Sequence, residues 1–116
     1  MRRDVQSAAP ARFYALKDQS EEVRQVAAWT LREIGPDAKD AVPALIEALK
    51  DQSEEVRQVA AWALGEIGPD AKDAVPALIE ALKDQSEYGR QDSAWALGET
   101  GPDAEDAVPA LIHALK

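Results

Sequence analysis

Apolar residues recur at helical spacing along most of the chain, in two alternating kinds of segment. At about 100° per residue, the longer kind, exemplified by residues 53–67, has one apolar stripe formed by Val56, Val59, Ala60, Ala63, Leu64 and Ile67. The shorter kind, from about residue 73 to 83, carries Pro76 in its first turn, where the missing N–H costs nothing. No segment has the two-residue period of a strand, so the pattern predicts an all-α fold.

Polar residues and glycine mark the expected ends of these helices. Asp51 and Ser53 can each cap the longer helix, because their side chains accept hydrogen bonds from the free N–H groups of a first turn. Gly68-Pro69 ends that helix, since proline cannot continue it. Asp73 is the predicted cap of the shorter helix. Ala61 and Gly65 fall away from the apolar stripe, so we expect them on the outer side of the longer helix.

The whole pattern repeats with a period of 33 residues, because Leu-Lys-Asp-Gln-Ser occurs at 16–20, 49–53 and 82–86. Block 16–48 differs from block 49–81 at only two positions, Thr30 and Arg32. Block 82–114 differs from block 49–81 at seven, which are Tyr88, Gly89, Asp92, Ser93, Thr100, Glu105 and His113. Two amphipathic helices of this length cannot bury their apolar faces alone, but stacked copies can.

The predicted architecture is therefore an α-solenoid, a right-handed stack of about three and a half helical hairpins in one domain, 1–116. A half-repeat over 7–17 precedes repeats at about 18–50, 51–83 and 84–116, because Ala8-Ala9-Pro10-Ala11 aligns with Ala41-Val42-Pro43-Ala44. The expected helices number seven: 7–17, 20–34, 40–50, 53–67, 73–83, 86–100 and 106–116.

The repeat resembles the HEAT-like repeat of the phycobilisome-lyase (E-Z) type over about residues 7–116. Three features carry the resemblance: Asp followed by Val-Arg, the Ala-Leu-Gly-x-Ile-Gly helix end, and the Ala-Val-Pro-Ala-Leu-Ile helix. It implies a curved solenoid that binds proteins on one surface, and some members of the family assist bilin attachment to phycobiliproteins. It also implies a structural ladder of hydrogen bonds between neighbouring repeats, formed by Asp18, Asp51, Asp84, Arg24, Arg57 and Arg90.

Composition narrows the function. The chain has 22 acidic and 13 basic side chains, a net charge of −9, no cysteine and one histidine, His113. An acidic surface repels phosphate backbones, and no apolar run approaches the ~18 residues of a membrane span, so neither a nucleic acid nor a membrane is expected as partner. The lack of cysteine excludes thiol catalysis, and one histidine makes no metal site. We expect a cytoplasmic protein with no catalytic residue, cofactor or metal.

Three tryptophans, Trp29, Trp62 and Trp95, recur one repeat apart at the flank of the apolar stripe. Each indole either packs between adjacent repeats or belongs to a ladder of partly exposed aromatics, the residue type enriched at binding hot spots. A second outward position, on the shorter helices, is taken in turn by Tyr14, Glu47, Glu80 and His113. These four form either a solvated face or a groove that is aromatic at one end and acidic in the middle.

These features predict a non-catalytic protein–protein interaction or scaffold module. Two alternatives stay open: an accessory subunit of a bilin-lyase-type enzyme, which the resemblance implies, and a self-assembling structural repeat unit. The latter follows from Leu111, Ile112 and Leu115, which no further helix covers, so we expect a homo-oligomer through this C-terminal end. Helix 86–100 has lost apolar residues from its stripe, which reflects either drift in a duplicated unit or a weakly held helix.

Overall fold

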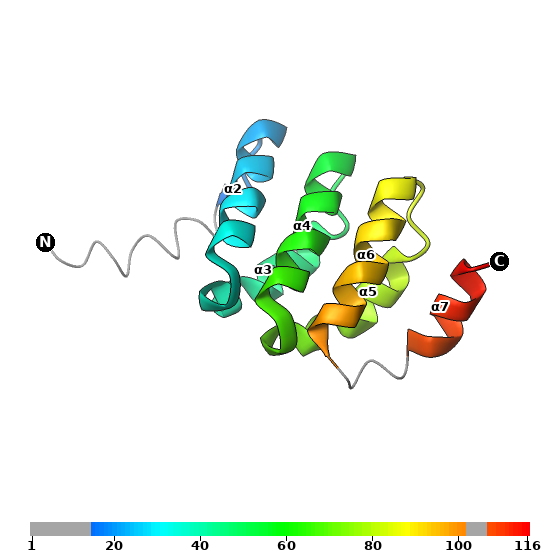
Figure 1. Ribbon diagram of the computed structural model, residues 1–116. Coiled ribbons are helices and arrows are strands. Elements are labelled where there is room, and N and C mark those ends of the chain that lie inside the picture. Colours follow the sequence, from blue (N-terminus) through cyan, green and yellow to red (C-terminus); the bar gives the residue numbers. More distant parts are fainter. Residues whose placement is uncertain (1–14, 102–106) are drawn as a thin grey trace, which may run out of the picture.

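The computed structural model describes residues 15–101 and 107–116, and these form helices and turns with no strand among them. Three long helices alternate with three short ones: α2 (Glu21–Ile34), α3 (Val42–Ala48), α4 (Glu54–Ile67), α5 (Val75–Ala81), α6 (Glu87–Thr100) and α7 (Val108–Ala114). The long helices α2, α4 and α6 stand in one row, and α3 and α5 lie in a second row behind it (Figure 1). This repeated two-row arrangement is an α-solenoid.

The prediction of seven helices is wrong, because the described residues hold three helices of 14 residues and three of only seven. In the first two repeats a 3-10 segment, η1 (Gly35–Ala41) or η2 (Gly68–Ala74), takes the start of the expected second helix. Non-helical angles at Ala71 (φ −100°, ψ 20°) kink η2. Asp73 lies inside η2, so the predicted cap is not one. The expected helix 7–17 lies outside the described residues up to residue 14.

The long helices begin and end where the polar residues indicate. Ser20, Ser53 and Ser86 are the N-caps, each accepting a hydrogen bond from the backbone N–H three residues later. Glycine closes α2 and α4, because Gly35 and Gly68 have φ values of 71° and 81° that other residues rarely adopt. Cap and closing glycine together place each long helix in the same register relative to its repeat.

The apolar core is continuous through the described repeats and deepest around α4, which contacts both α2 and α6. Val56, Ala60 and Leu64 are fully buried there, as the stripe predicts. Ala61 and Gly65, expected on the outer side, are buried too, because a helix with neighbours on both sides buries its flanks. No residue of α7 is buried. Among the described residues, no helix is long and apolar enough to cross a lipid bilayer.

Candidate functional site

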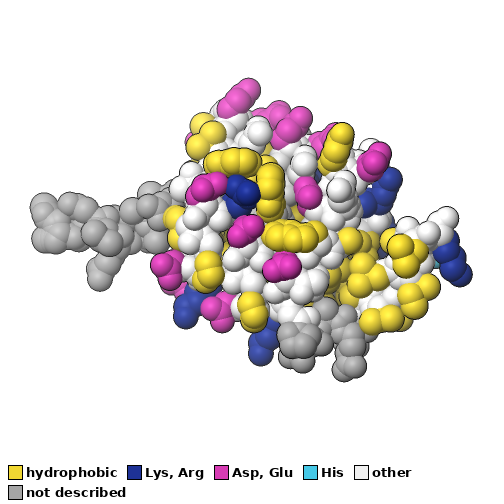
Figure 2. All heavy atoms as spheres, in the orientation of Figure 1, with side chains coloured by type: hydrophobic (Ala, Val, Ile, Leu, Met, Phe, Trp, Pro, Cys, Tyr) yellow, Lys and Arg dark blue, Asp and Glu magenta, His cyan; other side chains and the backbone are white. Residues whose placement is uncertain are grey.

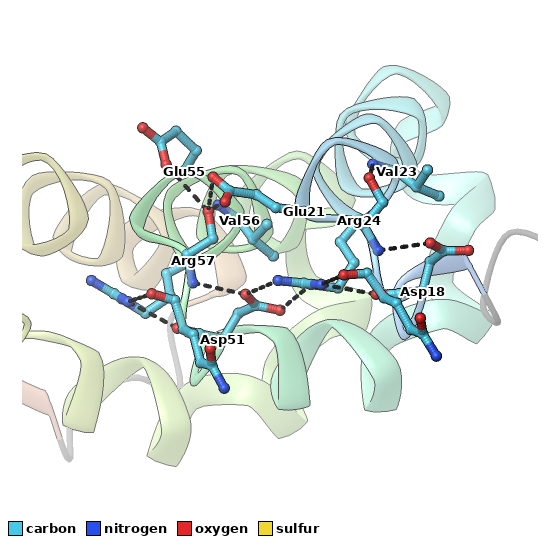
Figure 3. A network of polar contacts seen from close by, with 12 residues as sticks. Asp18, Glu21, Val23, Arg24, Asp51, Glu55, Val56 and Arg57 are labelled. Carbon is cyan, nitrogen blue, oxygen red and sulfur yellow. Dashed lines mark hydrogen bonds and ion pairs between the residues drawn. The ribbon is translucent and has the colours of Figure 1, made fainter.

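A ladder of arginines and aspartates joins the starts of successive long helices (Figure 3). The Arg24 guanidinium donates from Nε and Nη2 to both oxygens of Asp51, at 2.8 and 3.1 Å. Its Nη1 donates to the backbone carbonyls of Asp18 and Gln19, at 2.8 and 3.1 Å. Arg24 therefore clamps the turn of its own repeat to the carboxylate of the next, and the fork geometry makes the link directional.

The next rung has the same geometry. Arg57 donates from Nε and Nη2 to Asp84, at 2.7 and 3.3 Å, and from Nη1 to the carbonyl of Asp51 at 2.8 Å. Arg90 donates from Nη1 to the carbonyls of Asp84 and Gln85. Each ladder aspartate also accepts a hydrogen bond from the N–H of the capping serine two residues later, at 2.8 Å. The ladder thus fixes the spacing of the long helices.

Hydrogen bonding and charge pairing in the ladder shift the pKa of Arg24, Arg57 and Asp84. The hydrogen bonds that Arg24 donates to Asp51 and that Arg57 donates to Asp84 raise the pKa of both guanidinium groups, although burial acts to lower it. Burial pushes the pKa of Asp84 upward, but the hydrogen bonds from Arg57 and from the Ser86 N–H, with the nearby arginine charges, outweigh it. The pKa of Asp84 therefore lies below its usual range. These shifts keep the rung charged, as a structural link requires.

Trp29, Trp62 and Trp95 lie on the long helices α2, α4 and α6, and we call the surface of these helices that carries them the tryptophan face. Trp29 and Trp62 meet edge to face, with ring centroids 5.5 Å apart and planes at 88°. Trp29 and Trp95 are 43% and 39% exposed, and Trp62 is partly buried. The arrangement has a feature of each interpretation drawn from the sequence. The rings pack between adjacent repeats, and they are also partly exposed to solvent.

Trp62 and Trp95 pack against different residues of the repeat that precedes each of them. The guanidinium of Arg32 lies 3.7 Å from the ring centroid of Trp62 and 4.7 Å from that of Trp29. In the next repeat Gly65 replaces Arg32, and the ring of Trp95 covers it so closely that a Cβ on Gly65 would lie 2.2 Å from the ring. Gly98 holds the same position in α6, where a Cβ would meet nothing within 4 Å. The tryptophan face therefore changes from repeat to repeat.

Acidic side chains border the tryptophans. Glu33, Glu66 and Glu99 each follow a tryptophan by four residues, one helical turn on, and all three are exposed. Arg32 donates from Nη1 to Glu33 at 2.7 Å. Figure 2 shows hydrophobic and acidic side chains interspersed across this view of the long helices. The face thus combines flat aromatic rings with negative charge.

The second group that the sequence predicts occupies the outward position of the short helices. Glu47 on α3 pairs with Lys17 at 3.5 Å, and Glu80 on α5 lies 3.9 Å from Lys83, with all four side chains largely exposed. His113 on α7 lines a cleft of about 680 Å³ together with Arg90 and Leu115. Tyr14 lies outside the described residues. The structure therefore places the described members of this group on successive short helices, and not on the long helices that carry the tryptophans.

Two residues of the tryptophan face were not identified as site residues from the sequence. In the sequence Arg32 stands out only as one of two differences between blocks, and Gly65 only as a position outside the apolar stripe. The signal was present, because Arg32 lies three residues after Trp29, a spacing at which helical side chains touch. The described residues hold no group of three or more His, Asp or Glu side chains that would bind a metal ion.

Comparison with known proteins places the chain among repeat proteins. The family of HEAT repeats matches residues 9–73 and 42–116. A structure of the complex of CpcE and CpcF of phycocyanin lyase from Nostoc sp. PCC7120 is 32% identical, with a TM-score of 0.83, over 93% of this chain and 42% of that one. A designed armadillo repeat protein in complex with the peptide (KR)4 is 27% identical, with a TM-score of 0.70, over 91% and 52%.

An engineered protein of known structure is 26% identical, with a TM-score of 0.70, over 92% of this chain and 51% of that one. The chain thus spans about half of these solved structures or less. Comparison with curated proteins finds no match. The two overlapping family matches extend from residue 9 to residue 116, and the ladder and paired helices recur at the same period, so the chain belongs to the HEAT repeat family.

Proposed function

We propose that this chain is a non-catalytic protein–protein interaction module that holds its partner on the tryptophan face. One observation carries the proposal: Trp29 and Trp95 remain about 40% exposed although the ladder holds their helices in fixed register. Tryptophan is enriched at binding hot spots because a large rigid ring buries much area at little entropic cost. A rigid aromatic row that stays partly exposed is suited to recognition.

The solved relatives support this reading. One is a complex of CpcE with CpcF, and another holds a (KR)4 peptide. Both are therefore structures in which a repeat protein is engaged by a protein or peptide. The proposal includes a protein as partner, rather than nucleic acid or membrane, a cytoplasmic location, and no catalytic residue, cofactor or metal.

Affinity capture with the intact chain tests the proposal. Trp29→Ala and Trp95→Ala serve as baits beside the unchanged chain, and Ile112→Ala, which alters a side chain 52% exposed on α7, is the matched control. Proteins retained by the unchanged chain and the control should be lost from both tryptophan variants at unchanged Tm. Capture that is equal on all four baits, or no specific capture on any, contradicts the proposal.

An accessory subunit of a bilin-lyase-type enzyme is the second candidate. The observation that favours it is the 32% identity with the phycocyanin lyase complex over 93% of this chain. Under this alternative the captured proteins include pigment-bearing ones, detected by their visible absorbance. Captured partners that carry no pigment when expressed together with a bilin supply count against the alternative and leave the interaction module in place.

A further inference from the structure

The tryptophan face already binds one cation, which the chain itself supplies. The Arg32 guanidinium lies against the rings of Trp29 and Trp62, at 4.7 and 3.7 Å from their centroids, and donates a hydrogen bond to Glu33. Cation–π attraction and charge pairing here act on the same group. This contact shows what the combination of tryptophan and glutamate on this face selects, namely a guanidinium or ammonium group.

The other two repeats keep the tryptophan and the glutamate but lack an arginine of their own at the position of Arg32. Glycine stands in the place of Arg32 at positions 65 and 98. Trp95 and Glu99 are both exposed, and the space above Gly98 is open. Glu66 is exposed in the same way beside Trp62. Trp95 and Glu99 therefore have the chemistry of the Arg32 site without its occupant, whereas Arg32 already covers the ring of Trp62.

The charges of α4 and α6 point to a basic occupant. The basic residues of these two helices are Arg57 and Arg90, and both donate to the turns of the ladder at the helix starts. Acidic residues are spread along the exposed side, with Glu55 and Glu66 on α4 and Glu99 on α6. Attraction of a cationic segment to this side therefore meets no competing internal cation near Trp95.

We propose that the tryptophan face of α4 and α6 binds an extended basic segment of the partner protein, whose arginine or lysine side chains pair with Glu66 and Glu99, with one of them lying against Trp95. This inference rests on the proposed function and names the chemistry of the partner. Under this proposal the negative charge of the chain takes part in binding the partner.

Helix spacing sets the spacing of the basic side chains. Packed helices lie about 8–10 Å apart, and three residues of a polyproline II segment advance about 9 Å. A basic residue at every third position therefore presents one cation to each long helix. Such a segment crosses the row of α2, α4 and α6 without internal hydrogen bonds, and its limited flexibility lowers the entropic cost of binding.

The test uses a fluorescent peptide with the unit Pro-Ser-Arg repeated four times, and a peptide with Glu in place of Arg as its counterpart. Fluorescence anisotropy at low ionic strength measures binding to the intact chain. We expect the Arg peptide to bind and the Glu peptide not to bind. The double variant Glu66→Gln/Glu99→Gln should weaken binding roughly fivefold, from two exposed charge pairs.

A matched control separates local recognition from net charge. Glu47→Gln/Glu80→Gln removes the same two charges from exposed positions on α3 and α5 and should leave the affinity unchanged. Arg32→Gln vacates the place between Trp29 and Trp62 and should strengthen binding a few-fold, roughly the effect of one exposed cation–π contact. Equal weakening by both double variants, or no binding of the Arg peptide, overturns the inference.

The two proposals fail in different ways. If the Arg peptide does not bind while captured proteins still depend on Trp29 and Trp95, the basic chemistry is wrong and the interaction module stands. If the Arg peptide does not bind and capture is also indifferent to the tryptophans, both proposals are wrong. Binding of the Arg peptide that survives Trp95→Ala unchanged contradicts the site, because the ring is the surface on which the cation is placed.

Discussion

The second and the last repeat have nearly the same sequence but differently built cores. In α4, Val56, Val59, Ala60 and Ile67 are buried. In α6 the same positions carry Gly89, Asp92, Ser93 and Thr100, and Ser93 and Thr100 are 2% exposed. Capping serine, ladder arginine, tryptophan and glutamate are unchanged between the two repeats. The last repeat thus keeps the capping, ladder and tryptophan-face residues of the second repeat although it has lost apolar residues from its core. The residues of the surface and those of the core can therefore change independently.

Local contacts show how α6 accommodates these changes. A Cβ on Gly89 would lie 2.9 Å from Cγ of Asp84, so the ladder aspartate lies closer to this position than a side chain there would allow. The hydroxyl of Thr100 donates to the carbonyl of Leu97 at 3.2 Å. One carboxylate oxygen of Asp92, Oδ2, is buried with no hydrogen-bond partner. Asp92 is therefore the costliest of the replacements.

An aspartate at the position of the second repeat that is equivalent to Asp92 should have the largest effect on stability. Val59 is 5% exposed at the centre of the core, and Val59→Asp puts a carboxylate there with no cation to pair with it. We expect a loss of about 3 kcal/mol in the free energy of unfolding, measured by urea denaturation. Val26→Asp is the control, because the equivalent side chain in α2 is 62% exposed. An equal loss in both variants would contradict the importance of the central position.

The second-largest effect on stability should come from a change in the ladder, since the ladder connects the well-packed second repeat to the poorly packed last repeat. Arg57→Ala leaves Asp84 largely buried without its guanidinium, and we expect a loss of about 2 kcal/mol. The pKa of Asp84 is lowered in the folded chain, so the rung stabilises above the ordinary pKa and is lost as pH falls through the folded value. Acid sensitivity measured by circular dichroism should therefore diminish in this variant.

Arg90→Ala is the matched comparison for that change. Arg90 donates to two backbone carbonyls, and among the described residues it contacts no carboxylate of a following repeat. We expect a loss of about 1 kcal/mol, the value of neutral acceptors bonded to a charged donor at an exposed site. If Arg90→Ala costs as much as Arg57→Ala, the carbonyl contacts rather than the aspartate account for the stability of the ladder.

Periodicity predicted the long helices within one residue, because their apolar stripe, serine cap and closing glycine all agree. It failed on the short helices, where Gly-Pro-Asp-Ala-Lys-Asp-Ala forms 3-10 turns that have no distinct apolar period. The tryptophan positions followed from the repeat, but their surroundings did not. Whether a ring meets Arg32 or the backbone of Gly65 depends on side-chain packing between repeats, which spacing alone does not determine.

Repair of the last repeat should give a smaller effect of opposite sign. Asp92→Val restores the residue of the second repeat, and we expect a gain of about 1–2 kcal/mol at neutral pH. Burial raises the pKa of Asp92, opposed by the Gln58 side chain. The folded chain thus holds this proton more tightly than the unfolded chain, so stability is lost as pH rises from the ordinary pKa of 3.8 through the raised value.

Asp92→Val should therefore raise the free energy of unfolding more at neutral pH than below the ordinary carboxyl pKa. Denaturation at several pH values measures this difference. Hydrogen exchange adds a local readout. We expect amide protection in α6 to be lower than in α4 before the repair and closer to it afterwards. Equal protection of the two helices in the unchanged chain would mean that drift in the core has left α6 as firmly held as α4.

The smallest effect concerns the two glycines of the tryptophan face. Gly98→Ala adds a methyl group to open space on a helix, so we expect a gain of about 0.5–1 kcal/mol from helix propensity alone. Gly65→Ala makes the same change, but its Cβ would meet the ring of Trp95 at 2.2 Å, so the ring must move. We expect no such gain there, and a shift in tryptophan emission as Trp95 becomes more exposed. An equal gain from both alanines with unchanged emission would mean that Trp95 does not rest on Gly65, and that the two repeats present the same aromatic surface after all.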